Sequence, residues 1–248
     1  MGKERDSRVG SLRWLGCLQT LLSSDPSPAR QGTYDLVVQQ LIPGYASLAR
    51  LSVALLASSP LASTQESAVL VAGCGTGAEL LEAEAQRPDW QLTAIDPSAE
   101  MLAVARQRLQ NRGRIDWHHA TVEELGAESR FDGALSVLVL QSLPDDGTKL
   151  AFLTALARSL KPQGQLVLVD LMRPERSPLS PQVAEAWRCF QRASGVDGEA
   201  VDPTAQIQGF HPIGIARLTA LVEAAGLSDP APFFQALDFQ GFLLQRRA

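Results

Sequence analysis

Glycines and a carboxylate form the pattern in this sequence that most clearly predicts chemistry. Gly73, Gly75 and Gly77 lie between a short apolar run and a helical pattern, and Asp96 closes the next apolar run. Glycine permits positive φ and lets a ligand approach the backbone closely. In a wound parallel sheet both features open into one crevice, where a carboxylate can accept hydrogen bonds from two ribose hydroxyls. The pattern therefore predicts a site for a ribose-containing cofactor.

Alternating strand and helix patterns would position these residues. Short apolar runs predict strands, and the stretches between them carry helical spacing, with Ser98 expected to cap the second helix. This alternation predicts an α/β fold with a Rossmann-like, doubly wound parallel sheet. The expected strands are 68–72, 91–95, 115–119, one within 131–140, and 165–171; the expected helices are 78–87, 98–110 and 146–160.

The segments around this core predict covering elements. Leucines from Leu12 to Leu22 and the pattern over 33–57, broken at Pro43-Gly44, favour N-terminal helices. A proline-rich loop and a helical stretch with Trp187 and Phe190 follow the last core strand, where a substrate cover would lie. We expect an N-terminal helical cap over 1–66, a cofactor-binding core over 67–171, an inserted cover over 172–212, and a last helix with a closing strand hairpin over 213–248.

Composition narrows the classes of partner. The chain has 248 residues, 45% of them hydrophobic and 20% charged, which suits one domain with a lid. A net charge of −5 does not favour nucleic acid, although a local basic patch could still bind it. Three cysteines without paired spacing predict reduced thiols, no metal site and a cytoplasmic protein. We expect no membrane segment, because no uncharged apolar run approaches about 18 residues, and we leave a homodimer open.

Four motifs together resemble the class I S-adenosylmethionine-dependent methyltransferase family over about residues 68–171. They are Val69–Glu79, Ile95–Leu102, Phe131–Ser136 and Leu160–Leu166. The resemblance implies S-adenosylmethionine as cofactor and a seven-stranded sheet with an antiparallel last strand. It also implies that Met101 packs near the adenine. Thr121 stands where family members often have an adenine-contacting aspartate, so the backbone of Val122 would serve instead.

Three further segments are similar to carboxy-S-adenosylmethionine synthase, an enzyme of tRNA wobble-uridine modification. They are Ile42–Ser47, Val139–Leu143 and Phe234–Phe239. This resemblance implies a cofactor contact for Tyr45. That family also uses an arginine for the extra carboxylate, whereas residues 193–216 contain neither Arg nor Lys, and Val137 replaces a pocket asparagine. The residues expected to bind the cofactor are Tyr45, Gly73, Cys74, Gly75, Gly77, Asp96, Pro97, Met101, Thr121, Val122, Val137 and Leu138.

The predicted reaction is in-line methyl transfer to a small, partly apolar acceptor. Such a displacement needs positioning and water exclusion more than a general base, so no catalytic residue is assigned. Candidate acceptor contacts are Tyr34, Gln141, Arg173 and His211. One alternative is a carboxy-S-adenosylmethionine synthase-like enzyme; another is a non-catalytic S-adenosylmethionine-binding module. A nicotinamide dehydrogenase shares the glycine pattern but is disfavoured, because both tyrosines precede the motif and no Tyr-x-x-x-Lys pair can follow it.

Overall fold

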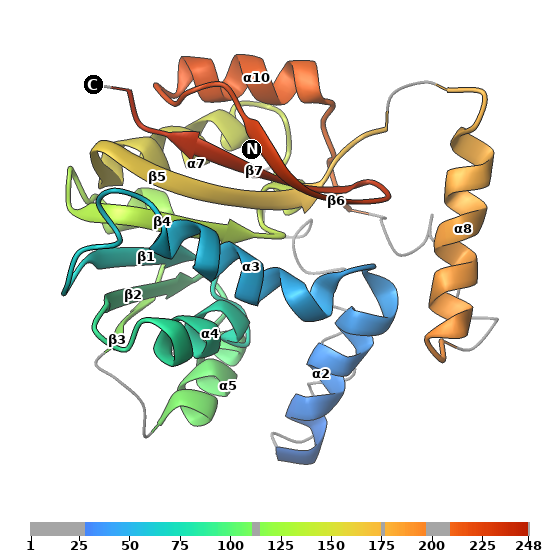
Figure 1. The fold of residues 1–248 in the computed structure, drawn as a ribbon, viewed down its shortest axis with the longest axis horizontal. Coiled ribbons are helices and arrows are strands. Elements are labelled where there is room, and N and C mark those ends of the chain that lie inside the picture. Colours follow the sequence, from blue (N-terminus) through green and yellow to red (C-terminus); the bar gives the residue numbers. More distant parts are fainter. Residues whose placement is uncertain (1–27, 111–114, 175–176, 197–208, 248) are drawn as a thin grey trace, which may run out of the picture.

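A computed structural model describes residues 28–110, 115–174, 177–196 and 209–247, with side chains from residue 35 onward. Its strands form one seven-stranded sheet in the order β3-β2-β1-β4-β5-β7-β6 (Figure 1). Strands β1 to β5 pair in parallel, and β7 is antiparallel to both β5 and β6, which confirms the predicted fold class. The strands are β1 Ala68–Ala72, β2 Gln91–Asp96, β3 Ile115–His119, β4 Phe131–Val137, β5 Leu160–Leu171, β6 Ala231–Ala236 and β7 Phe239–Gln245.

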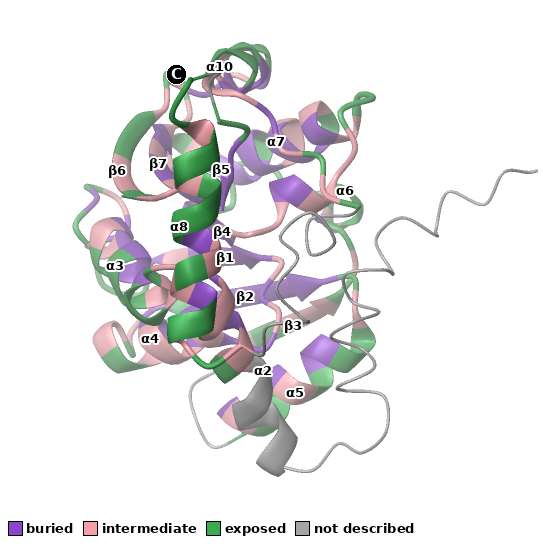
Figure 2. Cartoon of the chain, turned by 90° about the vertical axis from the view of Figure 1, so that its right-hand side faces the viewer, coloured by how far each residue is buried: buried purple, intermediate pink, exposed green. Residues whose placement is uncertain are grey.

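Helices cover both faces of the sheet. Helices α3, α4 and α5 lie on one face, and α6, α7 and α10 on the other, while α2 and α8 lie beyond the sheet (Figures 1 and 2). The helices are α2 Pro28–Leu41, α3 Tyr45–Ala57, α4 Ala78–Gln86, α5 Ala99–Leu109, α6 Val122–Leu125, α7 Thr148–Ser159, α8 Ser180–Ala193 and α10 Ile215–Ala224, with the 3₁₀ turn η1 at Leu140–Ser142.

The central strands are apolar because both of their faces are buried. In β1, Leu70 belongs to the core on the α7 and α10 side, whereas Val69 and Val71 belong to the core on the α3 and α4 side. Burying each such side chain contributes about 1.5–3 kcal/mol relative to exposure. Gly133 lets α3 approach β4, because a Cβ there would lie 2.7 Å from Cδ1 of Leu56. This close packing holds the sheet on which the glycine loop is mounted.

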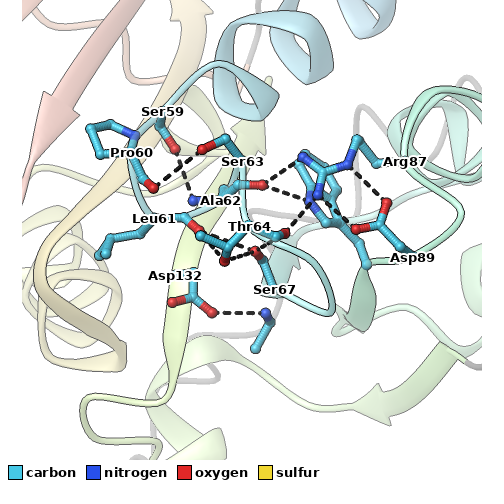
Figure 3. A network of polar contacts seen from close by, with 12 residues as sticks. Ser59, Pro60, Leu61, Ala62, Ser63, Thr64, Ser67, Arg87, Asp89 and Asp132 are labelled. Carbon is cyan, nitrogen blue, oxygen red and sulfur yellow. Dashed lines mark hydrogen bonds and ion pairs between the residues drawn. The ribbon is translucent and has the colours of Figure 1, made fainter.

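The segment before β1 is held by a polar network (Figure 3). Arg87 donates from Nη1 to the carbonyl of Ala62 at 2.8 Å and from Nη2 to that of Thr64 at 2.7 Å. Asp89 fixes the same guanidinium, which holds the pKa of that carboxyl at about 2. Asp132 accepts from the amide of Ala68 at 2.9 Å. These contacts fix the residue at which β1 begins.

Helices α2 and α8 pack together outside the sheet. The indole nitrogen of Trp187 donates to the carbonyl of Leu41 at 2.7 Å. Figures 1 and 2 show α8 in front of the carboxyl ends of the parallel strands, with most of its outward surface exposed. This is the position expected of a cover.

Within the described residues no single helix is long and apolar enough to span a membrane. Asp35–Leu41 and Tyr45–Ala57 meet the length and composition criteria only as a pair, bent by 98°.

Some boundaries differ from the predictions. The break at Pro43-Gly44, strands β1 and β3, and the Ser98 cap are confirmed, with Oγ of Ser98 accepting from the amide of Met101. Strand β5 begins at Leu160 rather than 165, because the expected turn is a bulge between two paired stretches. The helix predicted over 146–160 begins at Thr148, α6 and η1 were not predicted, and the helix expected at Leu12–Leu22 lies outside the described residues.

Candidate cofactor and acceptor site

The glycine loop crosses the carboxyl end of β2. The amides of Gly73 and Cys74 donate to the carbonyl of Ile95 at 2.8 and 3.1 Å. Gly73 has a φ of 69°, and a Cβ there would lie 2.4 Å from Cγ2 of Val139. Glycine is therefore required at this position both by the backbone conformation and by the approach of the residues after β4.

Asp96 joins this loop to the start of α5. Its Oδ2 accepts from the amide of Gly75 at 2.8 Å, and its Oδ1 accepts from the amide of Ser98 at 2.8 Å. The side chain is buried, which raises its pKa, and the two amide hydrogen bonds oppose that rise. Each carboxylate oxygen has further acceptor capacity, so both could accept from ribose hydroxyls.

The described residues fit the nucleoside part of S-adenosylmethionine. Gly75 has a φ of 50°, and a Cβ there would meet no heavy atom within 4 Å, so open space faces the loop beside Asp96. A cavity of about 200 Å³ adjoins the loop at Gly73. Its wall is largely apolar and suits an adenine ring. The lining includes Ile95, Pro97, Val122, Val139, Leu143 and Phe152.

Several predicted cofactor residues lie at this cavity. Pro97, Thr121 and Val122 line it. Thr121 also caps α6 in a capping box, in which its amide donates to Glu124 at 2.8 Å and its hydroxyl accepts from the amide of Glu124. Met101 is buried in the first turn of α5 and is not among the lining residues. The adenine contact expected of Met101 stays a prediction.

Cys74 differs from its neighbours because its side chain faces the core. Only 2% of it is exposed, and burial, followed by Asp96, raises the pKa of its thiol far above the usual range. A nucleophilic role therefore has no support, and the residue offers the site only its backbone. Gly77 lies against α5, where a Cβ would be 3.2 Å from that of Ala105.

An apolar cluster joins α2 and α8 to the ends of β5 and β7. Trp187 and Phe239 form its buried centre with ring centroids 5.6 Å apart and an interplanar angle of 85°. Tyr45 and Leu138 pack against it, and Val137 packs against the adjacent core. The other members are Val38, Ile42 and Leu171, with Leu41, Phe190, Phe210, Phe234 and Leu237 around them.

The structure brings together three of the four candidate acceptor residues. His211 donates from its amide to the carbonyl of Gln141 at 2.7 Å, and Arg173 donates from its amide to Ile213 at 2.9 Å. His211 and Arg173 are exposed, whereas Gln141 is buried and its Oε1 accepts from the amide of Leu171 at 2.8 Å. Gln141 thus supports the backbone here, and its acceptor contact stays a prediction. The side chain of Tyr34 lies outside the described residues.

Two buried charged residues under η1, Asp170 and Lys149, were missed in the sequence. Asp170 accepts from the amides of Leu140 at 3.2 Å and Gln141 at 2.8 Å, and Nζ of Lys149 donates to the carbonyl of Leu140. Burial raises the pKa of Asp170 to about 7, although the two amide hydrogen bonds and the charge of Lys149 lower it. One signal was available, because Asp170 is the charged residue in an otherwise apolar strand end.

Known proteins share both the sequence motifs and this fold. The family described as "Methyltransferase domain" matches residues 69–164. A ubiquinone biosynthesis O-methyltransferase from Xanthomonas oryzae pv. oryzae (strain PXO99A) is 39% identical over 108 residues, covering 42% of this chain and 43% of that protein. The chain therefore matches less than half of the length of this relative.

Two solved structures show the same fold. Human N-acetylserotonin methyltransferase, solved with S-adenosylmethionine, has a TM-score of 0.60 at 18% identity, covering 90% of this chain and 57% of that one. A possible exported protein from Bordetella parapertussis has a TM-score of 0.63 at 20% identity, covering 96% and 88%. These comparisons do not single out carboxy-S-adenosylmethionine synthase. The motifs, the sheet order and these matches agree: residues 69–164 match a methyltransferase domain, and the sheet has the class I S-adenosylmethionine-dependent methyltransferase fold.

Proposed function

We propose that this chain transfers a methyl group from S-adenosylmethionine to a small, partly apolar acceptor. The observation that carries the proposal is the contact between Asp96 and the amide of Gly75, next to an apolar cavity that Gly73 and Pro97 help to line. A ribose at Asp96 would place the base in that cavity and the rest of the cofactor along the glycine loop. The cofactor supplies a methyl group on a sulfonium, which is already activated for displacement.

The protein's own residues have positioning roles in this proposal. Asp96 would orient the ribose, and the glycine loop would leave room for the cofactor without a side chain in the way. The apolar cluster around Trp187 and Phe239 would exclude water from the acceptor side. Positioning and water exclusion can lower such a barrier by several kcal/mol without a general base.

Two observations favour a small acceptor over a macromolecule. The apolar cluster of α8 and β7 is joined through Leu138 to Val139, which lines the cavity, so an apolar acceptor would find apolar surroundings on this side. Two related proteins are named for small molecules, a methyltransferase of ubiquinone biosynthesis and N-acetylserotonin methyltransferase.

Titration calorimetry with S-adenosylmethionine and S-adenosylhomocysteine tests the cofactor part. Asp96→Asn should weaken binding by about 10- to 100-fold, because each hydrogen bond to a charged group contributes about 1.5–3 kcal/mol. Glu82→Gln, which alters an exposed pair with Arg50, is the matched control and should bind like the native chain. Binding of a nicotinamide cofactor instead of either ligand would contradict the proposal.

A methyl-transfer screen tests the acceptor part. Phenols, quinols, amines and small carboxylates are incubated with isotopically labelled S-adenosylmethionine, and label in the acceptor is measured by mass spectrometry. Transfer to one class supports the proposal. Tight binding without transfer to any of them would favour the non-catalytic module, and tight binding of carboxy-S-adenosylmethionine would favour the tRNA-modification alternative.

A further inference from the structure

Three residues from distant parts of the chain meet at the centre of the glycine loop. Thr76, between two of the glycines, donates from its hydroxyl to Oδ1 of Asp35 on α2 at 2.9 Å. Arg108 on α5 contacts Oδ2 of Asp35 through Nη2 at 2.7 Å and donates from Nη1 to the carbonyl of Thr76 at 2.9 Å. Asp35 and Arg108 therefore hold both the side chain and the backbone of Thr76.

This cluster is shielded enough for its charges to matter. The side chains of Asp35 and Arg108 are 18% and 23% exposed, and Thr76 is 4% exposed. Glu79 is buried close by, where burial raises its pKa to about 7; Asp35 acts in the same direction and Arg108 against it. Arg108 is thus the cation that balances the carboxyl groups of Asp35 and Glu79. Its removal would leave these two carboxyl groups close together without it.

The same helix that carries Asp35 contacts the cover. At the end of α2, the carbonyl of Leu41 accepts from Nε1 of Trp187 at 2.7 Å, and Trp187 lies on α8. Val38 and Ile42 pack into the apolar cluster with Trp187. A chain of direct contacts therefore leads from the glycine loop through α2 to α8.

We propose that Asp35 and Arg108 are positioning residues that couple the glycine loop to α2 and α8. Because they fix Thr76, a cofactor held by the loop stabilises the docked position of α2, and a docked α2 stabilises the loop that holds the cofactor. Such coupling is reciprocal, since each binding event favours the other by the same free energy. The inference rests on the proposed cofactor site and adds that the cover closes on the cofactor-loaded protein.

The test measures binding of S-adenosylhomocysteine by calorimetry in the native chain, Asp35→Ala, Arg108→Ala and the double variant. Each single variant should weaken binding at least about 5-fold, the lower end of typical couplings between sites. The double variant should lose little more than either single one, since both remove the same contact. Arg50→Ala, which removes the exposed pair with Glu82 between α3 and α4, should leave the affinity unchanged.

Hydrogen exchange provides the second readout. In the native chain, S-adenosylhomocysteine should slow exchange in α2 and α8, and in Asp35→Ala this protection should be lost. Asp35→Asn keeps the shape and can still accept from Thr76, so it tests the charge alone if Asp35→Ala does not fold.

The two proposals fail differently. Folded variants that bind S-adenosylhomocysteine like the native chain, or native α2 and α8 whose exchange is unchanged by the ligand, would overturn the coupling and leave the cofactor site standing. A native chain that binds neither S-adenosylmethionine nor S-adenosylhomocysteine would overturn both.

Discussion

Replacing Lys149 with methionine should reveal the role of the two buried charged residues under η1. Lys149 and Asp170 are 0% and 1% exposed. Asp170 holds the amides of η1, and Lys149 holds the carbonyl of Leu140, so both charges support the same turn. Burial lowers the pKa of Lys149, and Asp170 and then Asp145 oppose that change. Methionine keeps most of the volume and removes the cation together with its hydrogen bond to the carbonyl of Leu140.

The expected cost follows from leaving Asp170 buried without a cation. Removing one partner of a directly paired buried ion pair costs about 3–5 kcal/mol, which is an upper bound here because Lys149 and Asp170 both contact η1 rather than each other. The folded-state pKa of Asp170 is raised to about 7, so this group's contribution to stability falls as pH rises from about 4 to about 7 and then levels off. Without Lys149 the pKa rises further, and the fall continues above pH 7 at up to about 1.4 kcal/mol per unit. The difference in free energy of unfolding between the native chain and the variant should therefore grow by about 1.5 kcal/mol between pH 7 and pH 8.5.

Urea unfolding followed by circular dichroism at pH 6, 7 and 8.5 measures this difference. Lys161→Met is the control, because Lys161 pairs with Asp132 but its side chain is 42% exposed. This control should lower the free energy of unfolding by about 1 kcal/mol or less, and by the same amount at each pH. A Lys149→Met variant whose loss of stability is below 1 kcal/mol, or does not change with pH, would refute the reasoning.

Two further predictions concern the glycine loop. Gly73→Ala should lower the free energy of unfolding by about 2–4 kcal/mol in a urea titration, because its φ is positive and its new Cβ would meet Val139. Gly214→Ala is the control. A Cβ there meets no atom within 4 Å, so its free energy of unfolding should stay within about 0.5 kcal/mol of the native value. N-ethylmaleimide at pH 7.5 should label the exposed Cys189 and leave the buried Cys74 unmodified, as measured by peptide mass mapping. Equal labelling of the two thiols would show that the loop opens.

The fold was predictable wherever its signals are local. Strands β1 and β3 and the cap at Ser98 have the expected positions, because apolar runs and capping residues act on their immediate neighbours. The start of β5 was not predictable in this way. Pro162 and Gly164 read as a turn, yet the strand runs on through a bulge, since Leu160 pairs with Phe131 on β4. That pairing depends on a distant strand.

In the candidate site, too, only the residues with a local sequence signal could be predicted. The glycines and Asp96 could be predicted as site residues from the sequence, because a bound cofactor would require particular backbone conformations and a carboxylate at one strand end. Asp35 and Arg108 were not, because each is an ordinary charged helix residue until the fold brings them together. Lys149 is equally ordinary in the sequence, and its burial follows only from how α7 packs on the sheet.

The turn after β4 contributes to both the proposed cofactor cavity and the apolar cluster on the proposed acceptor side. Val139 lines the cavity proposed for adenine, whereas the preceding Leu138, with a φ of 60°, packs against the apolar cluster on the acceptor side. One peptide thus carries a wall of each compartment, and Asp170 holds the amides of the next two residues. A shift of this turn would move both walls at once. Substitutions in the turn should therefore change cofactor and acceptor binding together, whereas Phe239, on a strand outside it, contributes to the acceptor side alone.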